Sequence, residues 1–361
     1  MPRVKFSFVL KWLLVACSTV LVLLSSEFGL RAFSVDLRLM RKILFYQNAL
    51  LPLHRTSLNA QRLYELKPGA SVQMGPLHSK ETKYTKDHKI QLSVNTLGFR
   101  GKVFSPIKKA GVFRIMVFGA SNTFGLGVSD EDTYPAQMQR ILDEMYPGKV
   151  EVWNAGVCGY QMSQNVAYAE SVVNKFDPDL VILQDTNRGR RPFYYNVTVK
   201  ELRELFGKNR ELFAENIPAF NERDRSYLGR LSNFLTLHSA LYRTLYTGFH
   251  MRHWDPLEIC FDYGQRTSNR DFNRFTERHG DRNVILFYVA RDEYEDRIVP
   301  IIMRKNLSVF VLNTKGKPDE YRDLHPPSYV HAWCAQELCD FLVQKGFLPA
   351  ASPNSEKPGS L

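Results

Sequence analysis

Ser121 occupies a position that suits a nucleophile. Residues 113–118 are predicted to form a buried strand, which Gly119 breaks into a tight turn that presents the serine. A helix is predicted to follow at about 132–145. A serine at the carboxyl end of a parallel strand, just before a helix, lies where α/β folds keep their sites. Main-chain N–H groups at such a turn favour developing negative charge, so Ser121 is a candidate nucleophile, with a plain helix-capping role as the alternative.

The turn at Ser121 lacks two motifs that would indicate other chemistry. It contains neither a Gly-Lys-Ser/Thr ending nor a Gly-x-Gly-x-x-Gly pattern, which argues against nucleotide binding. It also differs from the Gly-x-Ser-x-Gly elbow, because Thr123 occupies the last position.

Other polar groups follow neighbouring strands or come late in the chain. Gly159 follows the second predicted strand, Asn187 follows the third, and Asp323 and His325 precede the last helix. Carboxyl ends of parallel strands meet at one edge of a sheet, so the first groups should lie near Ser121. Serine attack on an acyl carbon needs a base, a group that orients the base, and donors for the oxyanion. The chain offers each of these parts.

With these residues in this order, the chain resembles the SGNH (GDSL) hydrolase family. That family carries Ser, Gly and Asn in successive blocks, followed by Asp and His near the end. The corresponding residues here are Ser121 in FGASNTFGLGV, Gly159 in NAGVCGY, Asn187 in LQDTNRG, and Asp323 with His325 in YRDLHPP. The resemblance covers residues 95–345, apart from an insertion in the middle.

The resemblance implies a role for each matched residue. Ser121 is expected to be the nucleophile, His325 the base, and Asp323 the acid that orients it. The implied oxyanion hole consists of the N–H groups of Ser121 and Gly159 together with the side-chain amide of Asn187. The resemblance implies neither a metal nor an organic cofactor, and it implies an acyl ester as the substrate.

The chain departs from the family pattern at three places. Ala120 stands where the family usually has Asp, and Arg188 ends the third block in place of Asp. The acid and the base are two residues apart, whereas Asp-x-x-His is usual, and strict spacing would place Arg322 at the position of the acid. Asp319 is therefore the alternative orienting acid.

Alternating strands and helices predict a flavodoxin-like three-layer α/β/α sandwich with a parallel five-stranded sheet. The strands are expected at 113–118, 150–155, 180–184, 284–289 and 308–312, and the later helices at 161–175, 292–305 and 328–345. The predicted domain spans 111–349, followed by a disordered tail at 350–361. Within it, 191–282 is too long for a strand-to-helix connection, so this insertion is expected to be a helical cap over the carboxyl edge of the sheet.

The amino-terminal region is predicted to anchor the chain in a membrane. The apolar run at 6–25 reaches the ~20 residues that a span requires. An uncleaved transmembrane anchor at 1–32 is favoured, because no small-x-small cleavage site closes the run. A signal peptide and lipidation at Cys17 are the alternatives. Residues 33–110 then form a juxtamembrane and lead-in segment, in which the turn at 94–101 is expected to pack beneath the first strand.

Charge and cysteine usage restrict the classes of partner. The formal net charge of +11 is spread along the chain without long basic runs, so nothing points to nucleic acid. Five cysteines do not form a disulfide framework. Cys334 and Cys339 lie roughly 140° apart around a predicted helix, so they should not pair with each other.

Three functional hypotheses remain open. The leading one is a membrane-anchored serine esterase that acts on an O-acyl group of a cell-envelope glycan or lipid. The second is an O-acyltransferase that uses the same acyl-enzyme on an extracellular polysaccharide. The third is a non-catalytic envelope protein that retains the fold. Resemblance to anchored members of the family places the domain outside the cytoplasm, in the periplasm.

Overall fold

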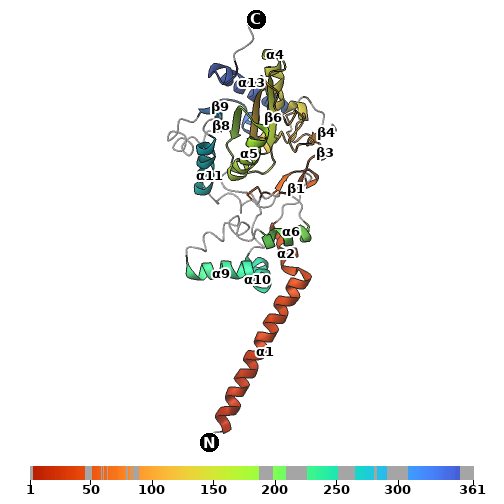
Figure 1. Ribbon diagram of the computed structural model, residues 1–361. Helices are drawn as coiled ribbons and strands as arrows, with labels where there is room; N and C mark the ends of the chain where they lie inside the picture. The colour runs from red at the N-terminus through yellow and green to blue at the C-terminus, as the bar shows by residue number, and fades with distance from the viewer. Residues whose placement is uncertain are drawn as a thin grey trace. The chain divides into compact units, whose positions relative to one another are not determined.

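A five-stranded parallel sheet forms the centre of the larger part of the protein (Figure 1). The structure, a computed structural model, describes residues 3–44, 51–57, 59, 61–62, 64–78, 80–81, 83, 89–186, 198–208, 226–250, 265–279, 283–290 and 308–349. Across the sheet the strands are β6 (Val150–Gly156), β5 (Phe113–Gly119), β7 (Leu180–Gln184), β8 (Asn283–Ala290) and β9 (Ser308–Asn313). This order, with the first strand of the sheet between the second and the third, is that of flavodoxin-like folds and confirms the predicted fold class.

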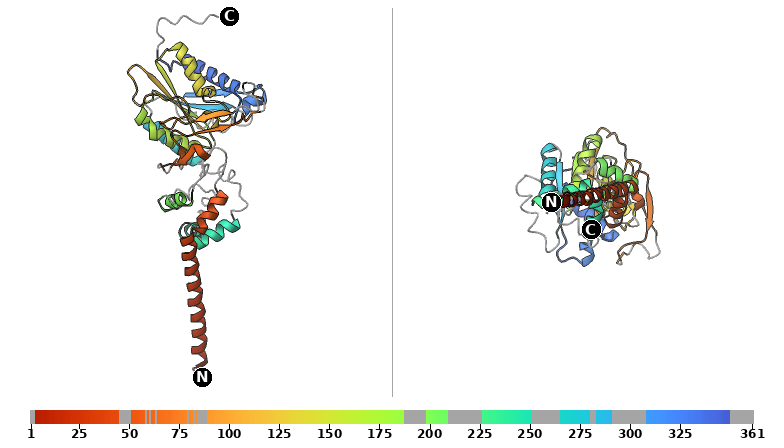
Figure 2. Two further views of the ribbon diagram at one scale, coloured as in Figure 1. Left: turned by 90° about the vertical axis from the view of Figure 1, so that its right-hand side faces the viewer. Right: turned by 90° about the horizontal axis from the view of Figure 1, so that it is seen from below.

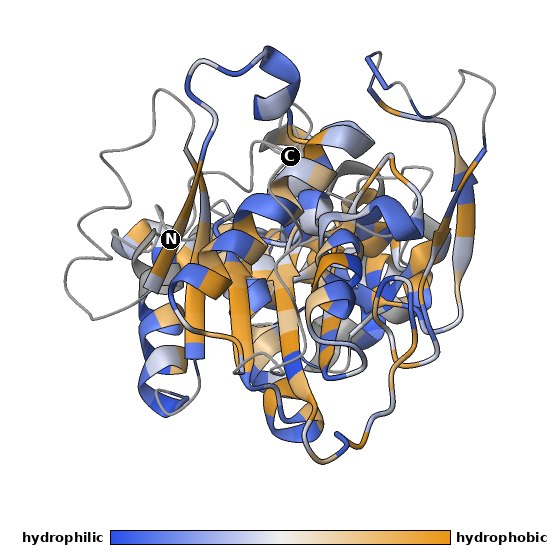
Figure 3. Ribbon diagram, turned by 90° about the horizontal axis from the view of Figure 1, so that it is seen from above, coloured by the Kyte–Doolittle hydropathy of each residue, from blue (hydrophilic) through white to orange (hydrophobic). Residues whose placement is uncertain are grey.

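Helices cover both faces of the sheet, as Figure 2 shows. One face carries α4 (Tyr134–Met145) and α13 (Ser328–Gln344), and the other carries α5 (Met162–Phe176) and α11 (Gln265–Arg278). The strands are apolar because both of their faces are covered, and Figure 3 shows these hydrophobic strands running between the helices. Along β5, Ile115 and Val117 belong to the core beneath α4 and α13.

The predicted elements agree closely with those observed. All five strands occur within one residue of their predicted ends, and the helices predicted at 161–175 and 328–345 are α5 and α13. The helix predicted from residue 132 begins two residues later as α4, after a short 3-10 turn, η2 (Asp130–Asp132). The predicted helix 292–305 and the predicted tail 350–361 lie outside the described residues.

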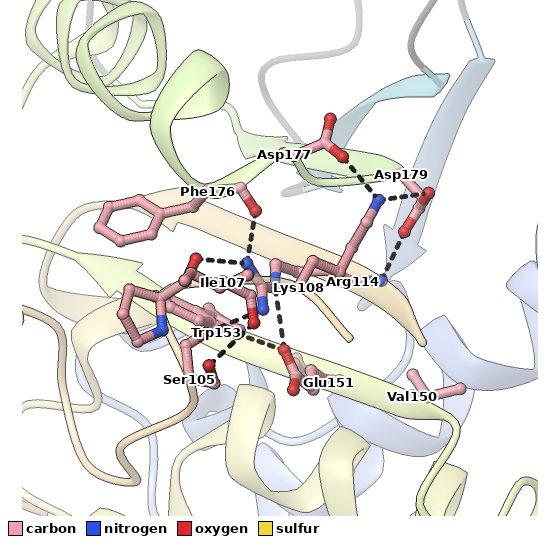
Figure 4. A network of polar contacts seen from close by, with 12 residues as sticks. Ser105, Ile107, Lys108, Arg114, Val150, Glu151, Trp153, Phe176, Asp177 and Asp179 are labelled. Carbon is pink, nitrogen blue, oxygen red and sulfur yellow. Dashed lines mark hydrogen bonds and ion pairs between the residues drawn. The ribbon is translucent and has the colours of Figure 1, made fainter. Parts of the chain in front are cut away.

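A buried arginine closes the amino-terminal end of the sheet (Figure 4). Arg114 is fully buried at the start of β5, and its Nε donates to Oε2 of Glu151 at 2.8 Å. The two terminal nitrogens of the guanidinium, Nη1 and Nη2, donate to main-chain oxygens of Ser105, Pro106 and Phe176. This network satisfies a buried charge far from the carboxyl edge, so its role is structural.

The described residues between 51 and 93 include two small antiparallel strand pairs. The 3-10 turn η1 (Leu51–Leu53) leads into β1 (His54–Thr56), which pairs with β2 (Tyr64–Leu66), and β3 (Ser71–Met74) pairs with β4 (Ile90–Ser93). The turn predicted at 94–101 forms a bridge to β6. Its Arg100 N–H donates to the main-chain oxygen of Asn154 at 3.0 Å.

A second compact unit consists of residues 1–46 and 196–260. It contains α1 (Arg3–Phe33), α2 (Val35–Leu44), α6 (Val199–Lys208), α9 (Tyr227–His238) and α10 (Ala240–His250). The carboxylate of Glu27 in α1 accepts the N–H groups of Ala240 and Leu241, both at 2.8 Å, and so caps α10. Asp36 of α2 forms an ion pair of 2.7 Å with Arg243 of α10, and both side chains are buried.

The contacts divide the insertion predicted at 191–282 between the two units. Residues 196–260 associate with the amino-terminal helices, whereas α11 packs against α5 in the sheet domain. The described helices of the insertion therefore belong to both units. A covering role over the sheet edge stays a prediction.

Helix α1 contains a stretch that is long and apolar enough to cross a membrane. This stretch is Phe8–Phe33, with a mean hydropathy of 2.2, and none of it is buried in the protein. A signal sequence would meet the same criterion of length and composition.

Candidate active site

The structure brings Ser121 and His325 together at the carboxyl edge of the sheet. Oγ of Ser121 lies 2.9 Å from Nε2 of His325, although the two residues are 204 positions apart in the chain. The serine begins the short helix α3 (Ser121–Phe124) directly after β5, and the histidine lies in the loop before α13. This distance permits direct proton transfer between a serine hydroxyl and a neutral imidazole.

Two glycines allow the turn of Ser121 to lie against the strand ends. A Cβ atom on Gly119 would lie 2.0 Å from Oγ1 of Thr123, and one on Gly156 would lie 2.2 Å from the main-chain nitrogen of Phe124. Neither position has room for a side chain. The close approach of α3 to the ends of β5 and β6 therefore depends on glycine at both places.

A buried hydrogen-bond network inside the sheet domain holds the same turn. The hydroxyl of Thr123 donates to Oε1 of Gln184 at the end of β7, which leaves the hydroxyl of Tyr134 to donate to Thr123 at 2.8 Å. From β6, Nδ2 of Asn154 donates to the main-chain oxygen of Thr123 at 2.8 Å, and its Oδ1 accepts the N–H of Gly156 at 2.9 Å. Strands β6 and β7 and helix α4 thus hold the turn that presents Ser121.

Sequence reasoning missed the residues of this network. Asn154 and Gln184 are polar side chains within otherwise apolar strand ends, and that contrast was the available signal. A buried amide in a strand needs partners, so each such residue predicts a local hydrogen-bond network.

The structure describes two of the three predicted oxyanion donors, Ser121 and Gly159. Gly159 has a φ of 79°, a backbone conformation that residues with an L side chain rarely adopt. The loop before it is joined to β5, because the N–H of Val157 donates to the main-chain oxygen of Gly119 at 3.0 Å. Within the described part of the chain, no hydrogen bond uses the N–H of Ser121 or of Gly159. Both groups are therefore available to bind an oxyanion, whereas Asn187 lies outside the described residues and its role stays a prediction.

Asp323 lies beside His325 and contacts its main chain. Oδ1 of Asp323 accepts the N–H of His325 at 2.9 Å, so the carboxylate stabilises the short Asp-x-His turn. The other oxygen, Oδ2, lies 3.3 Å from Nε2 of His78, a residue from the lead-in segment that sequence reasoning did not select. Asp319, the alternative acid, lies in the 3-10 turn η4 (Asp319–Arg322) that precedes this loop.

The electrostatic environment favours a neutral His325. Burial lowers the pKa of His325 below its ordinary value, and the negative charge of Asp323 opposes this effect by raising that pKa. A neutral imidazole is the form that accepts a proton from a serine hydroxyl, so burial keeps the base competent at neutral pH.

His331 is a core residue of the sheet domain. It is buried against Tyr134, with their rings stacked at 6.1 Å, and its Nδ1 accepts the main-chain N–H of Tyr134 at 3.2 Å. Burial lowers the pKa of His331 to about 3, so the ring stays neutral.

The described cysteines are free thiols, and no metal-binding cluster occurs among the described residues. Cys17, Cys158, Cys334 and Cys339 are free, and Cys260 lies outside the described residues. Among the residues that the structure describes, no group of three or more His, Cys, Asp or Glu side chains is arranged to hold a metal ion.

Comparison with known proteins finds similar folds at low identity. No protein-family model and no curated protein matches the chain. A lipase/acylhydrolase from Enterococcus faecalis is 14% identical, with 68% of this chain and 100% of that chain covered and a TM-score of 0.40. A mutant acetylxylan esterase from Geobacillus stearothermophilus is 13% identical, with coverages of 67% and 100% and a TM-score of 0.37.

A two-domain esterase active on acetylated mannans is 17% identical, with a TM-score of 0.35. The match covers 69% of this chain but only 54% of that esterase. Likeness at these values assigns no function to this chain.

Replacing Gly156 with alanine should disrupt the turn of Ser121. The new methyl group would overlap the main chain of Phe124, so we expect a loss of about 1–3 kcal/mol in the free energy of unfolding. Labelling of Ser121 by a fluorophosphonate should slow in parallel. Urea unfolding and labelling rates measure both effects. Gly75→Ala is the control, because a Cβ atom there meets nothing within 4 Å, and equal behaviour of the two variants would contradict the packing argument.

The pH dependence of labelling should report the pKa of His325. Because the neutral ring is the base, the rate should fall as pH drops through that pKa, at a pH below the ordinary histidine value of about 6.5. Asp323→Asn removes the charge that raises this pKa, so the acid limb should move to still lower pH while the maximal rate falls. Asp319→Asn should change neither. An acid limb that stays fixed or moves upward in Asp323→Asn would contradict the assignment.

Proposed function

We propose that the protein is a serine hydrolase that cleaves an O-acyl ester through an acyl-enzyme on Ser121. The observation that carries this proposal is the 2.9 Å separation of Ser121 Oγ and His325 Nε2 at the carboxyl edge of the sheet. The N–H groups of Ser121 and Gly159, for which the described residues provide no hydrogen-bond acceptor, are the proposed place for negative charge.

Acylation begins when His325 takes the hydroxyl proton of Ser121 on Nε2. As this proton moves, Oγ attacks the acyl carbon, and the carbonyl oxygen becomes an oxyanion bound by the N–H groups of Ser121 and Gly159 and the predicted amide of Asn187. His325 then returns the proton to the leaving alkoxide. The positive imidazolium that forms between these steps is stabilised by the adjacent carboxylate of Asp323.

Deacylation reverses the same steps with water in place of the alcohol. His325 takes a proton from water, hydroxide oxygen attacks the acyl carbon, and Ser121 leaves with the proton returned from Nε2. An O-acetyl group on a cell-envelope glycan, or an ester of an envelope lipid, is the substrate class that fits a domain held at a membrane.

We also propose that α1 is an uncleaved membrane anchor and that the catalytic domain is periplasmic. The apolar stretch Phe8–Phe33 contains Glu27, the residue of α1 that caps α10. A helix end that stabilises another helix of the same unit is expected to stay in the mature protein.

Turnover of p-nitrophenyl esters by purified full-length protein tests the hydrolase proposal. Ser121→Ala should abolish turnover, and His325→Ala should cost nearly as much, because members of a catalytic unit act non-additively. Asn187→Ala should lower kcat by about 10²–10³-fold through loss of one oxyanion donor. Ser171→Ala is the matched control, since its hydroxyl bonds only to the main chain of α5.

Full turnover in Ser121→Ala would overturn the proposal. Absence of turnover and of probe labelling in the wild type would instead favour a non-catalytic envelope protein. Addition of a sugar acceptor separates hydrolysis from transfer, because a transferase would place the acyl group on the sugar in preference to water.

Membrane fractionation tests the anchor. The full chain should stay in the membrane fraction after a carbonate wash, and deletion of residues 1–26 should release the protein. A reporter enzyme that works only after export should be active when it is fused after Lys345, and a reporter that works only in the cytoplasm should be inactive there. A wild-type chain that is already shortened and soluble would contradict the anchor.

A further inference from the structure

The carboxylate of Asp323 has one oxygen that its own loop does not use. Oδ1 accepts the N–H of His325, Oδ2 takes no part in that hydrogen bond, and the side chain is 43% exposed. A half-exposed carboxylate samples several rotamers unless a second contact holds it. A second contact that holds the carboxylate matters more at the short Asp-x-His spacing, because only one residue separates the acid from the base.

His78 is placed to supply that second contact. Its Nε2 lies 3.3 Å from Oδ2 of Asp323, and its side chain is only 12% exposed. Its other ring nitrogen, Nδ1, accepts the main-chain N–H of Lys80 at 3.1 Å. An accepting Nδ1 carries no proton, so the ring is the neutral tautomer with its proton on Nε2, the nitrogen that faces the carboxylate.

Residues near His78 contact the chain both before and after the loop that carries Asp323 and His325. We call the described residues Leu77, His78, Lys80, Glu81 and Lys83 the latch segment. Nζ of Lys80 lies 2.8 Å from Oε2 of Glu320, which precedes the loop. Glu81 accepts both the N–H and the hydroxyl of Ser328, each at 2.7 Å, immediately after the loop.

The contact of Glu81 also completes the amino terminus of α13. The residue before this helix is Pro327, which provides no side-chain cap, so Glu81 serves as the capping group from a distant segment. A carboxylate at a helix amino terminus is also favoured by the helix dipole. Lys83 forms a further ion pair with Asp132. The latch segment is therefore held at three points, with His78 directed at Asp323.

We propose that His78 is a positioning residue that holds Asp323 beside His325 by donating its Nε2 proton to Oδ2. This inference rests on the proposed serine hydrolase function and extends the Ser121–His325–Asp323 arrangement by one residue. His78 touches neither substrate nor the reacting atoms. It restricts the carboxylate to the orientation that stabilises the imidazolium, and catalytic hydrogen bonds of this kind tighten when substrate binds.

Kinetics of two His78 variants in the full-length protein test the proposal. His78→Leu removes the donor and should lower kcat by about 10–100-fold with KM changed less than about twofold, because only positioning is lost. His78→Gln keeps an N–H donor at similar reach and should recover most of the rate. Ser171→Ala, whose hydroxyl donates to the main-chain oxygen of Tyr168 within α5, is the control and should stay near the wild type.

A double-mutant cycle separates positioning from a general structural role. If His78 acts through Asp323, the loss caused by His78→Leu should vanish in an Asp323→Asn background. A loss of equal size in both backgrounds, or wild-type kcat in His78→Leu, would overturn the proposal.

Nuclear magnetic resonance of ring-labelled histidine gives a readout that needs no turnover. His78 should show the tautomer protonated on Nε2, and its ring signals should shift in Asp323→Asn but not in Asp319→Asn. Signals that do not respond to Asp323→Asn would overturn the positioning role even in an active enzyme. If the wild type cleaves no ester yet these signals respond, the hydrolase proposal fails while the contact between His78 and Asp323 stands.

Discussion

The contact between Ser121 Oγ and His325 Nε2 is the constraint on which the functional account depends. Its 2.9 Å length joins residues 204 positions apart, so neither local sequence nor one element can set it. The parallel sheet sets it, because β5 ends at the nucleophile and the loop before α13 reaches the same edge. A shift of about 1 Å at either side can cost two orders of magnitude in rate. Rigid support on both sides is therefore expected.

The two sides of this contact are supported in different ways. The serine side depends on close packing, because Gly119 and Gly156 admit α3 against the strand ends while Thr123 binds three neighbouring elements. The histidine side is a loop, and it depends on contacts from the latch segment to the residues before and after it. The lead-in segment thus contacts the chain on both sides of His325.

Much of the sheet domain could be predicted from sequence, since the buried parallel strands are largely apolar runs, and β5, β6, β7 and β9 end at a glycine or a polar residue. The selection of Ser121, Gly159 and His325 followed from that pattern together with the family resemblance. The partners of Thr123 and the approach of His78 could not be predicted, because these are contacts between distant segments without a local signature. The insertion was treated as one cap, although Glu27 and Asp36 bind its helices to the amino-terminal unit through long-range contacts that no periodicity reveals.

Peptide mapping by mass spectrometry after reaction with a fluorophosphonate tests the central claim most directly. The account predicts one covalent adduct per chain, located on Ser121, and no adduct in His325→Ala over the same reaction time. An adduct on a different serine, or equal labelling of Ser121 in His325→Ala, would contradict the assignment of these two residues as nucleophile and base.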